Sequence, residues 1–217
     1  CWAFSNHDVN RHVSRFAQSA EEREDVAKLA ISVLSTLRGS ICLYQGEELG
    51  LPEAELAFED LTDPYGIRFW PAFKGRDGCR TPMPWVSGEP HAGFTTATKP
   101  WLRVPAEHDA LAVDTQDGRQ GSVLEHYRQT LSFRKAHPAL IDGDMDFLDL
   151  EEDVLAFTRK KGEDRLLFVF NLRRGPQEVT LPPRLAVKEL IGMPGLSGSL
   201  LEGRLVIESL DGFCARI

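Results

Sequence analysis

The sequence predicts a chain of mixed class, with an α/β segment first and an all-β segment after it. Three observations lead to this prediction: a helix followed directly by a buried strand at residues 20–45, a proline-rich stretch at residues 47–120, and short strand-like runs after Pro138. A strand end, a helix and a buried strand in succession form a βαβ unit. We therefore expect parallel pairing in the first part and an antiparallel sheet in the last.

The first helix is predicted over residues 20–38. Apolar residues recur there at helical spacing, Ser19 and Glu22 form a capping box, and a glycine follows. The next residues, 40–45, are a short apolar run between two glycines, which is typical of a strand buried on both faces. We therefore expect Cys42, which lies in this run, to behave as a small buried hydrophobe.

The stretch at residues 47–120 contains eight prolines and little periodicity. A loop of this length inside a compact domain is usually functional. Three of the four tryptophans lie in it, namely Trp70, Trp85 and Trp101. We expect at least two of them to pack the loop onto its domain, the alternative being that their rings are presented to a ligand.

A second helix is predicted over residues 121–137, where Ser122 and Glu125 form another capping box and Pro138 ends the helix. The pattern then changes to short runs of strand-forming residues separated by glycine-containing turns, one of them at residues 202–203. This pattern predicts a small antiparallel β domain with its boundary near residue 139. The runs cover residues 147–150, 154–159, 166–172, 178–181, 187–191, 205–209 and 213–217.

Bulk properties exclude several classes of protein. The 25 basic and 33 acidic residues give a net charge of −8, spread along the chain, which argues against nucleic acid as a partner. No apolar run of about eighteen residues is present, so we expect no membrane span. The four cysteines are far apart and show neither metal spacing nor the density of a disulfide scaffold, which favours reduced thiols, a cytoplasmic protein and no metal or cofactor.

Three motifs occur in order: Phe-Ser-Asn-His-Asp-Val-Asn-Arg at residues 4–11, Leu-Tyr-Gln-Gly-Glu-Glu-Leu-Gly at residues 43–50, and Gly-Arg-Asp-Gly-Cys-Arg-Thr-Pro-Met-Pro-Trp at residues 75–85. Together they resemble the α-glucosidase and oligo-1,6-glucosidase branch of glycoside hydrolase family 13, the α-amylase superfamily. The resemblance covers most of the chain and weakens after about residue 140. It implies that residues 1–138 are the C-terminal part of a TIM (β/α)8 barrel, with residues 47–120 as an active-site loop. Residues 139–217 are then a C-terminal β-sandwich domain.

The resemblance implies a retaining α-glucosidase that hydrolyses short oligosaccharides or small α-glucosides. In that family an Asp nucleophile and a Glu acid/base lie on barrel strands before the Asn-His-Asp segment, so neither is expected in this sequence. The chain opens at Cys1, and we expect it to be the C-terminal piece of a longer enzyme, inactive without its N-terminal part. Exposed sheet edges would also favour self-association of the isolated piece.

Three residues are the strongest candidates for contact with the sugar. By resemblance, Asp8 stabilises the transition state by holding the 2- and 3-hydroxyls of the sugar, and His7 donates a further hydrogen bond. The alternative for Asp8 is an ion pair with Arg11. By resemblance, Arg76 binds the non-reducing end of the same sugar, and its alternative role is to anchor the loop through Asp77.

Other polar residues are expected to support these three without contacting substrate. Glu47 and Glu48 are not the catalytic pair in the family, and adjacent residues on a strand point to opposite faces. Glu47 is instead predicted to support the site from behind, as are Asn6, Arg11 and Arg80.

Alternative functions remain open. Within the superfamily, the complete protein could be a sucrose- or trehalose-type isomerase or a glucosyltransferase, which differ in how well water is excluded from the acceptor side. A non-catalytic subunit is a second alternative, which the Asn-His-Asp motif and Arg76 argue against. A third is a β domain that binds carbohydrate independently, but residues 139–217 contain no Trp or Tyr.

Overall fold

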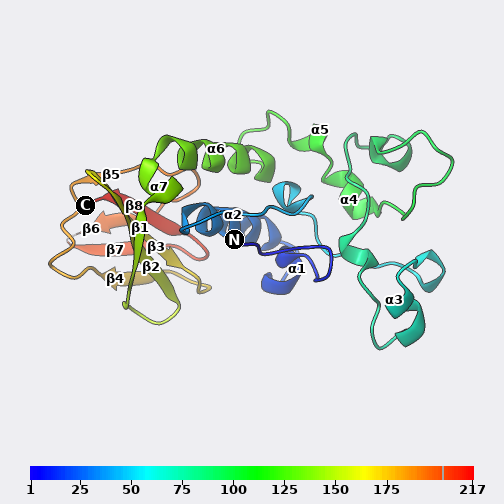
Figure 1. The fold of residues 1–217 in the computed structure, drawn as a ribbon, viewed down its shortest axis with the longest axis horizontal. Coiled ribbons are helices and arrows are strands. Elements are labelled where there is room, and N and C mark those ends of the chain that lie inside the picture. The colour runs from blue at the N-terminus through cyan, green and yellow to red at the C-terminus, as the bar shows by residue number, and fades with distance from the viewer. Residues whose placement is uncertain (202) are drawn as a thin grey trace. The chain divides into compact units, whose positions relative to one another are not determined.

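The fold is described from a computed structural model that places residues 1–201 and 203–217 (Figure 1). The chain divides into two compact units. We call residues 1–2, 28–41 and 126–217 the scaffold unit, and residues 3–27 and 42–125 the loop unit. The boundary predicted near residue 139 remains a prediction.

The helices fall into two long ones and many short ones. The long ones are α2 (Arg23–Thr36) and α6 (Val123–Ala136). The short α-helices are α1 (His12–Phe16), α3 (Pro64–Phe69), α4 (Ala106–Ala110), α5 (Val113–Gln116) and α7 (Pro138–Asp142). Short 3-10 helices are η1 (Glu47–Leu49), η2 (Phe58–Asp60), η3 (Asp77–Cys79) and η4 (Pro90–Gly93).

The strands all lie in the last third of the chain and pair antiparallel. One sheet has the strand order β1-β2-β3-β8-β5 and the other β4-β7-β6. In chain order the strands are β1 (Asp144–Leu148), β2 (Val154–Lys161), β3 (Asp164–Asn171), β4 (Gln177–Thr180), β5 (Glu189–Leu190), β6 (Ser199–Leu201), β7 (Arg204–Ile207) and β8 (Gly212–Arg216). The sequence predicted this domain but missed β6, a strand of three residues. The turn predicted at 202–203 includes Glu202, which lies outside the described residues.

The two sheets of the scaffold unit share one apolar core. Ala156, Leu167 and Val169 contribute to it from the first sheet, and Leu205 and Ile207 from the second. Because β3 is buried along most of its length, its other face is covered too, and α7 packs against β2 and β3. This arrangement of two facing sheets is a β-sandwich.

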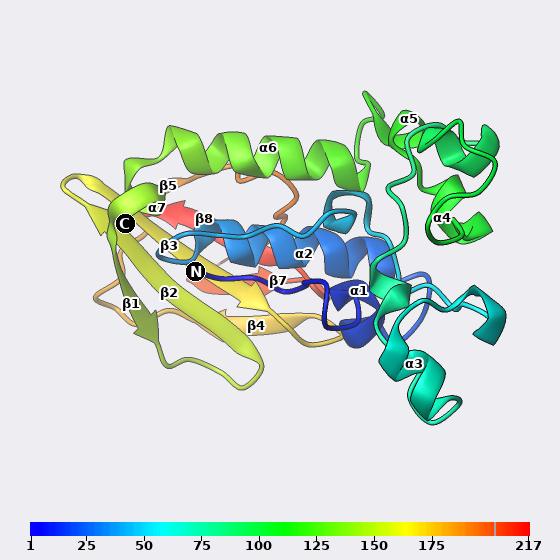
Figure 2. The same cartoon turned by 45° about the vertical axis from the view of Figure 1, so that its right-hand side comes forward.

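Both long helices were predicted from their apolar spacing, and both predictions are confirmed with shifted ends. The backbone N–H of Glu125 donates to Ser122 Oγ at 3.2 Å, as the capping box before α6 requires. Before α2, Glu22 instead accepts from the backbone N–H of Gln18, and the helix begins at Arg23. In the scaffold unit the two helices lie side by side in both views (Figures 1 and 2).

The strand predicted at residues 40–45 is wrong. This segment forms a single parallel bridge, between Trp2 and Ile41, and the rest of it is irregular. A strand needs a neighbour that pairs with successive backbone groups, and the described segment pairs at one position only. Cys42 is exposed rather than buried. The parallel direction of the bridge agrees with the predicted βαβ connection through α2.

The stretch at residues 47–120 is irregular, as predicted, and contains short helices (Figure 2). Small apolar clusters hold it, one of them formed by Leu49, Leu51 and Leu124. The prediction that at least two of its tryptophans pack the loop onto its domain stays a prediction; within the loop, the ring of Trp70 lies 5.7 Å from the ring of Phe58. All three are exposed, at 36% for Trp70, 49% for Trp85 and 54% for Trp101.

Candidate active site

Asp8 lies between two guanidinium groups in the loop unit. Arg76 Nη1 and Arg80 Nη2 each donate to Asp8 Oδ1 at 3.0 Å. The other carboxylate oxygen, Oδ2, lies 3.4 Å from His7 Nε2. The Asp8 side chain is 52% exposed and that of His7 is 69% exposed. One oxygen of Asp8 is therefore fixed by cations, while the other faces solvent beside an imidazole.

The turn that carries Asp8 is held by its neighbours on both sides. Asn6 Oδ1 accepts from the backbone N–H of Asp8 at 2.8 Å, a contact typical of an Asx turn. Arg80 Nε donates to the His7 carbonyl at 2.7 Å, in addition to its bond with Asp8. The structure thus brings together four of the predicted residues, His7, Asp8, Arg76 and Arg80, and places Asn6 directly behind them.

Arg76 is fixed by a residue that the sequence analysis did not identify. Asp63 accepts from Arg76 three times: from Nε at 2.9 Å, from Nη2 at 3.0 Å and from the backbone N–H at 2.8 Å. The Asp63 side chain is fully buried, and it also caps α3 through the N–H of Tyr65. An Asp directly before Pro64 is a helix start signal, and this pattern could have singled it out.

The predicted alternative for Arg76, an ion pair with Asp77, is wrong. Asp77 accepts instead from the backbone N–H groups of Thr62, at 2.6 Å, and of Asp63, at 2.8 Å. Asp77 is fully buried. Asp77 therefore fixes the segment that carries Asp63, and Asp63 in turn fixes Arg76.

The charges around Asp8 keep it ionised. A hydrogen bond from Arg76 is the main cause that lowers the pKa of Asp8 below its usual value. The hydrogen bond from Arg76 likewise holds the pKa of Asp63 well below its usual range. The same pairing raises the pKa of Arg76, so all three groups are charged at neutral pH.

Arg11 does not pair with Asp8, and that predicted alternative is wrong. Its guanidinium is buried, and it donates to the carbonyls of Gln45 at 2.7 Å and of Cys79 at 3.0 Å. A Cβ at Gly46, whose φ is 87°, would lie 2.6 Å from Arg11 Nη1, so the guanidinium fits only against a glycine. Arg11 thereby ties all three sequence motifs to one another.

Glu47 lies behind the Asn-His-Asp segment rather than at its surface. Its side chain is 2% exposed, and Oε1 lies 3.6 Å from His12 Nδ1, which also contacts Ser5 Oγ at 3.1 Å. Glu47 and Glu48 lie on η1, not on the expected strand. Burial raises the pKa of Glu48, whose carboxylate accepts from the backbone N–H of Gly46.

Within residues 1–201 and 203–217, no group of three or more His, Cys, Asp and Glu side chains is arranged to bind a metal ion. Across that same part of the chain, no helix combines the length and the hydrophobicity that crossing a bilayer requires.

Comparison with known families assigns the two parts of the chain. Residues 1–143 match the α-amylase catalytic domain, and residues 145–204 match the maltogenic amylase C-terminal domain. The chain belongs to the α-amylase family. This confirms the predicted fold class for the α-amylase chain: the C-terminal part of a (β/α)8 barrel followed by an antiparallel β domain.

Relatives of this α-amylase family chain carry glucosidase names. A probable α-glucosidase of Rhizobium meliloti is 48% identical over 217 residues, which is 100% of this chain and 39% of the relative. A probable oligo-1,6-glucosidase of Bacillus subtilis is 34% identical over 78% of this chain and 33% of its own length. The chain therefore spans well under half of these curated relatives.

Two solved structures are similar to this chain in fold. The α-glucosyl transfer enzyme XgtA is 49% identical, with a TM-score of 0.91, and the match covers 99% of this chain and 39% of XgtA. The trehalulose synthase MutB is 27% identical, with a TM-score of 0.83, over 100% of this chain and 43% of MutB.

Proposed function

We propose that the complete protein is a retaining α-glucosidase that hydrolyses α-glucosidic bonds in short oligosaccharides, and that this chain supplies the transition-state-stabilising carboxylate. The observation that carries the proposal is the geometry of Asp8. Two arginines bind its Oδ1, and its Oδ2 lies half-exposed beside His7. An ionised acceptor next to a donor matches two neighbouring hydroxyls of a sugar ring.

Asp8 acts through charge rather than as nucleophile or acid. Cleavage with retention passes through an oxocarbenium-like transition state in which positive charge develops on the sugar. A carboxylate already ionised and already fixed interacts more strongly with that state than with the neutral substrate, which lowers the barrier. The lowered pKa of Asp8 is consistent with this role.

Arg76 limits the sugar that can be accepted. Asp63 fixes its guanidinium on one edge and Asp8 accepts from Nη1. A cation held in this way is suited to close the end of the binding site at the non-reducing sugar. A binding site closed at this sugar would leave no room for further sugar units beyond it, so the enzyme would act on chain ends.

The supporting residues hold this geometry in place. Arg80 binds both the His7 carbonyl and Asp8, and Asn6 fixes the turn. Arg11 and Glu47 support the Asp8 segment through contacts on its buried side. The nucleophile and the acid/base are assigned to a part of the protein outside this chain, as is the partner surface that completes the barrel.

The test uses the intact protein and an aryl α-glucoside as substrate. For Asp8→Asn we expect kcat/KM to fall by roughly 10²–10³-fold with an unchanged fold, because one charge that stabilises the transition state is removed. Asp142→Asn is the matched control, since Asp142 is an exposed carboxylate paired with Lys161, and it should keep wild-type activity. Wild-type kcat/KM in Asp8→Asn would refute the assigned role.

The chain by itself should not turn over the same substrate. Turnover above background that survives Asp8→Ala would contradict the division of roles between this chain and the rest of the enzyme. Size-exclusion chromatography of the same sample tests the predicted self-association, which a monodisperse monomer would contradict.

A second candidate function is transfer of the glucosyl unit to a sugar acceptor. The similarity to XgtA, described as an α-glucosyl transfer enzyme, favours it at 49% identity. The Asp8 site serves both reactions, because they share the step in which the glycosidic bond breaks. With maltose as both donor and acceptor, hydrolysis gives glucose alone, whereas transfer gives a trisaccharide and releases one glucose for each trisaccharide formed. A trisaccharide yield close to the glucose yield would favour the second candidate.

A further inference from the structure

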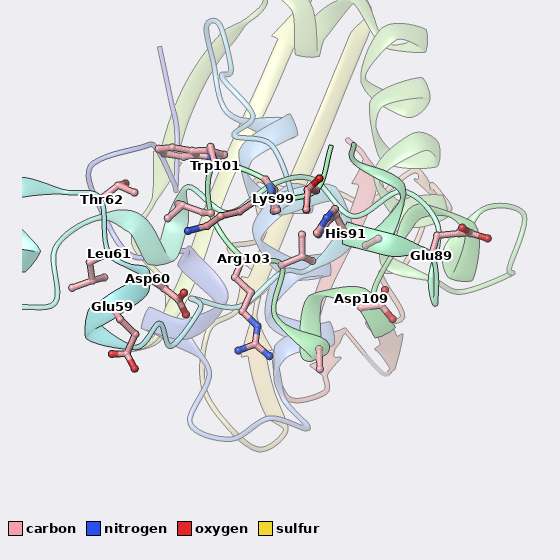
Figure 3. A pocket seen from close by; sticks show the side chains of 16 residues that line it. Glu59, Asp60, Leu61, Thr62, Glu89, His91, Lys99, Trp101, Arg103 and Asp109 are labelled. Atoms are coloured by element: carbon pink, nitrogen blue, oxygen red, sulfur yellow. The ribbon is translucent and has the colours of Figure 1, made fainter. Parts of the chain in front are cut away.

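The loop unit contains a pocket of about 610 Å³ that the proposed catalysis does not use. Its lining comes from three segments, residues 59–62, residues within 89–92 and residues within 98–109 (Figure 3). None of His7, Asp8 and Arg76 lines it. Its volume lies within the range of about 300–1,000 Å³ that is typical of small-molecule sites.

Trp101 forms part of this lining and is 54% exposed. Within the described part of the chain, no aromatic ring or guanidinium packs on its indole. Leu102, the next residue, is 2% exposed and belongs to the small apolar cluster with Ala54 and Leu56. Leu102 therefore anchors the segment, and packing does not account for the large exposed ring beside it.

The polar groups of the pocket fall into two sets. Asp109 accepts from Ser87 and Gly88, so it has a structural role. In contrast, the side chains of Asp60, Lys99 and Arg103 make no hydrogen bond or ion pair within residues 1–201 and 203–217. Figure 3 shows Asp60, Lys99 and Trp101 around the same hollow. An acceptor and two donors thus line the same pocket as an aromatic ring.

The charge of the lining argues against an anionic ligand. Four acids line the pocket, Glu59, Asp60, Glu89 and Asp109, against the two bases Lys99 and Arg103. An excess of negative charge disfavours phosphates and carboxylates. A neutral ligand with many hydroxyls can use both kinds of polar group, and the apolar face of a sugar ring can stack on an indole.

We propose that this pocket is a second sugar-binding site, which holds one end of a neutral oligosaccharide away from the residues that act on the glycosidic bond. Trp101 stacks on a ring, Asp60 accepts from hydroxyls, and Lys99 and Arg103 donate to them. The site goes beyond the proposed function and rests on it only for the choice of ligand.

The test is calorimetric titration of maltotriose into the intact protein carrying Asp8→Asn, in which we expect the substrate to be consumed slowly. Adding Trp101→Ala should weaken the binding by about tenfold, the upper range for loss of one aromatic contact. Trp85→Ala is the matched control, since Trp85 is 49% exposed and does not line the pocket, and it should change the affinity less than twofold. Equal affinities in all three proteins, equal losses in both tryptophan variants, or no maltotriose binding would overturn the proposal.

Two further measurements distinguish this proposal from a role of the pocket in catalysis and from binding of an anionic ligand. Trp101→Ala in the otherwise unchanged enzyme should hydrolyse an aryl α-glucoside, which is too short to reach a second site, at the wild-type rate. Inorganic phosphate should not displace maltotriose, and displacement that depends on Lys99 and Arg103 would overturn the neutral-ligand assignment. The catalytic proposal has its own readout, because a wild-type rate of Asp8→Asn on an aryl α-glucoside would refute it, whereas the second site is tested by the difference in affinity between Trp101→Ala and Trp85→Ala. Thr62 is unsuited to the test because it also binds Asp77.

Discussion

Two buried arginines, Arg159 in the scaffold unit and Arg11 in the loop unit, use the same chemistry to hold different kinds of structure. Arg159 donates to the carbonyls of Thr36 at 2.6 Å and Gly143 at 3.1 Å, and so ties the end of α2 to the start of the β domain. Arg11 donates to the carbonyls of Gln45 and Cys79, which belong to two of the sequence motifs. A buried guanidinium that donates to backbone carbonyls therefore joins two elements of the scaffold in one unit and two segments of the candidate site in the other.

The two units also differ in what surrounds these arginines. In the scaffold unit a continuous apolar core lies between two sheets, and the burial of Arg159 lowers its pKa to about 10. The loop unit has small apolar clusters and relies on carboxylates such as Asp63 and Asp77. We therefore expect the stability of the scaffold unit to depend on its buried apolar area. The geometry of the loop unit should depend instead on ion pairs and hydrogen bonds.

The largest effect is expected from the core of the scaffold unit. Phe168→Ala removes a fully buried ring that lies 5.6 Å from the ring of Phe157, and should lower the free energy of unfolding by about 3–5 kcal/mol. Urea denaturation measures the loss. Phe147→Ala is the control, because Phe147 is 61% exposed and should cost far less. Equal losses in the two variants would mean that this face of the first sheet, opposite the core between the sheets, is not packed as described.

Replacing each buried arginine by methionine tests the comparison directly. Each change leaves buried carbonyls without donors, so both variants should lose unfolding free energy, at roughly 1–3 kcal/mol per carbonyl. Arg11→Met should also lower kcat/KM for an aryl α-glucoside in the folded enzyme, because Arg11 holds the carbonyl of Cys79, a residue whose backbone N–H donates to the Arg76 carbonyl. Arg159→Met should not. A matching fall in kcat/KM for Arg159→Met would remove the distinction between the two arginines.

Acid should weaken both units through buried neutral histidines. Burial lowers the pKa of His126 in the scaffold unit and of His108 in the loop unit, each from 6.5 to about 4. As the pH falls from about 6.5 to about 4, the unfolded chain binds a proton that the folded chain does not. Stability present above pH 6.5 is therefore lost, with a slope approaching about 1.4 kcal/mol per pH unit for each histidine.

Denaturation at several pH values measures this slope. The variants His126→Asn and His108→Asn should each have a smaller slope than the wild type between pH 6.5 and 4. A slope that neither variant changes would show that other groups cause the acid sensitivity.

The smallest effect is expected at the surface. Lys161 and Asp142 form an exposed ion pair at 2.6 Å, with side chains 49% and 61% exposed. Lys161→Ala should change the free energy of unfolding by less than about 1 kcal/mol, and the change should shrink further in high salt. A larger, salt-independent loss would mean that surface charge contributes to the scaffold unit as it does to the loop unit.

The sequence alone determined much of this protein. The two long helices, the antiparallel β domain and the irregular stretch at residues 47–120 follow from local periodicity, capping residues and turn signals, which act over a few residues. The motifs also identified Asp8, Arg76 and Arg80 before any contact among them was visible. Each of these features depends on residues close together in the sequence or on a sequence motif.

Tertiary structure decided which groups pair. Asp8 binds Arg76, 68 positions away, rather than the nearby Arg11, and the anchor Asp63 was missed. The segment at residues 40–45 has strand-like composition but too little pairing to form a strand. Ion-pair partners and strand neighbours depend on which distant segments the fold brings into contact, and no short-range pattern encodes that choice. The pocket at Trp101 appears for the same reason only when segments from three parts of the loop meet.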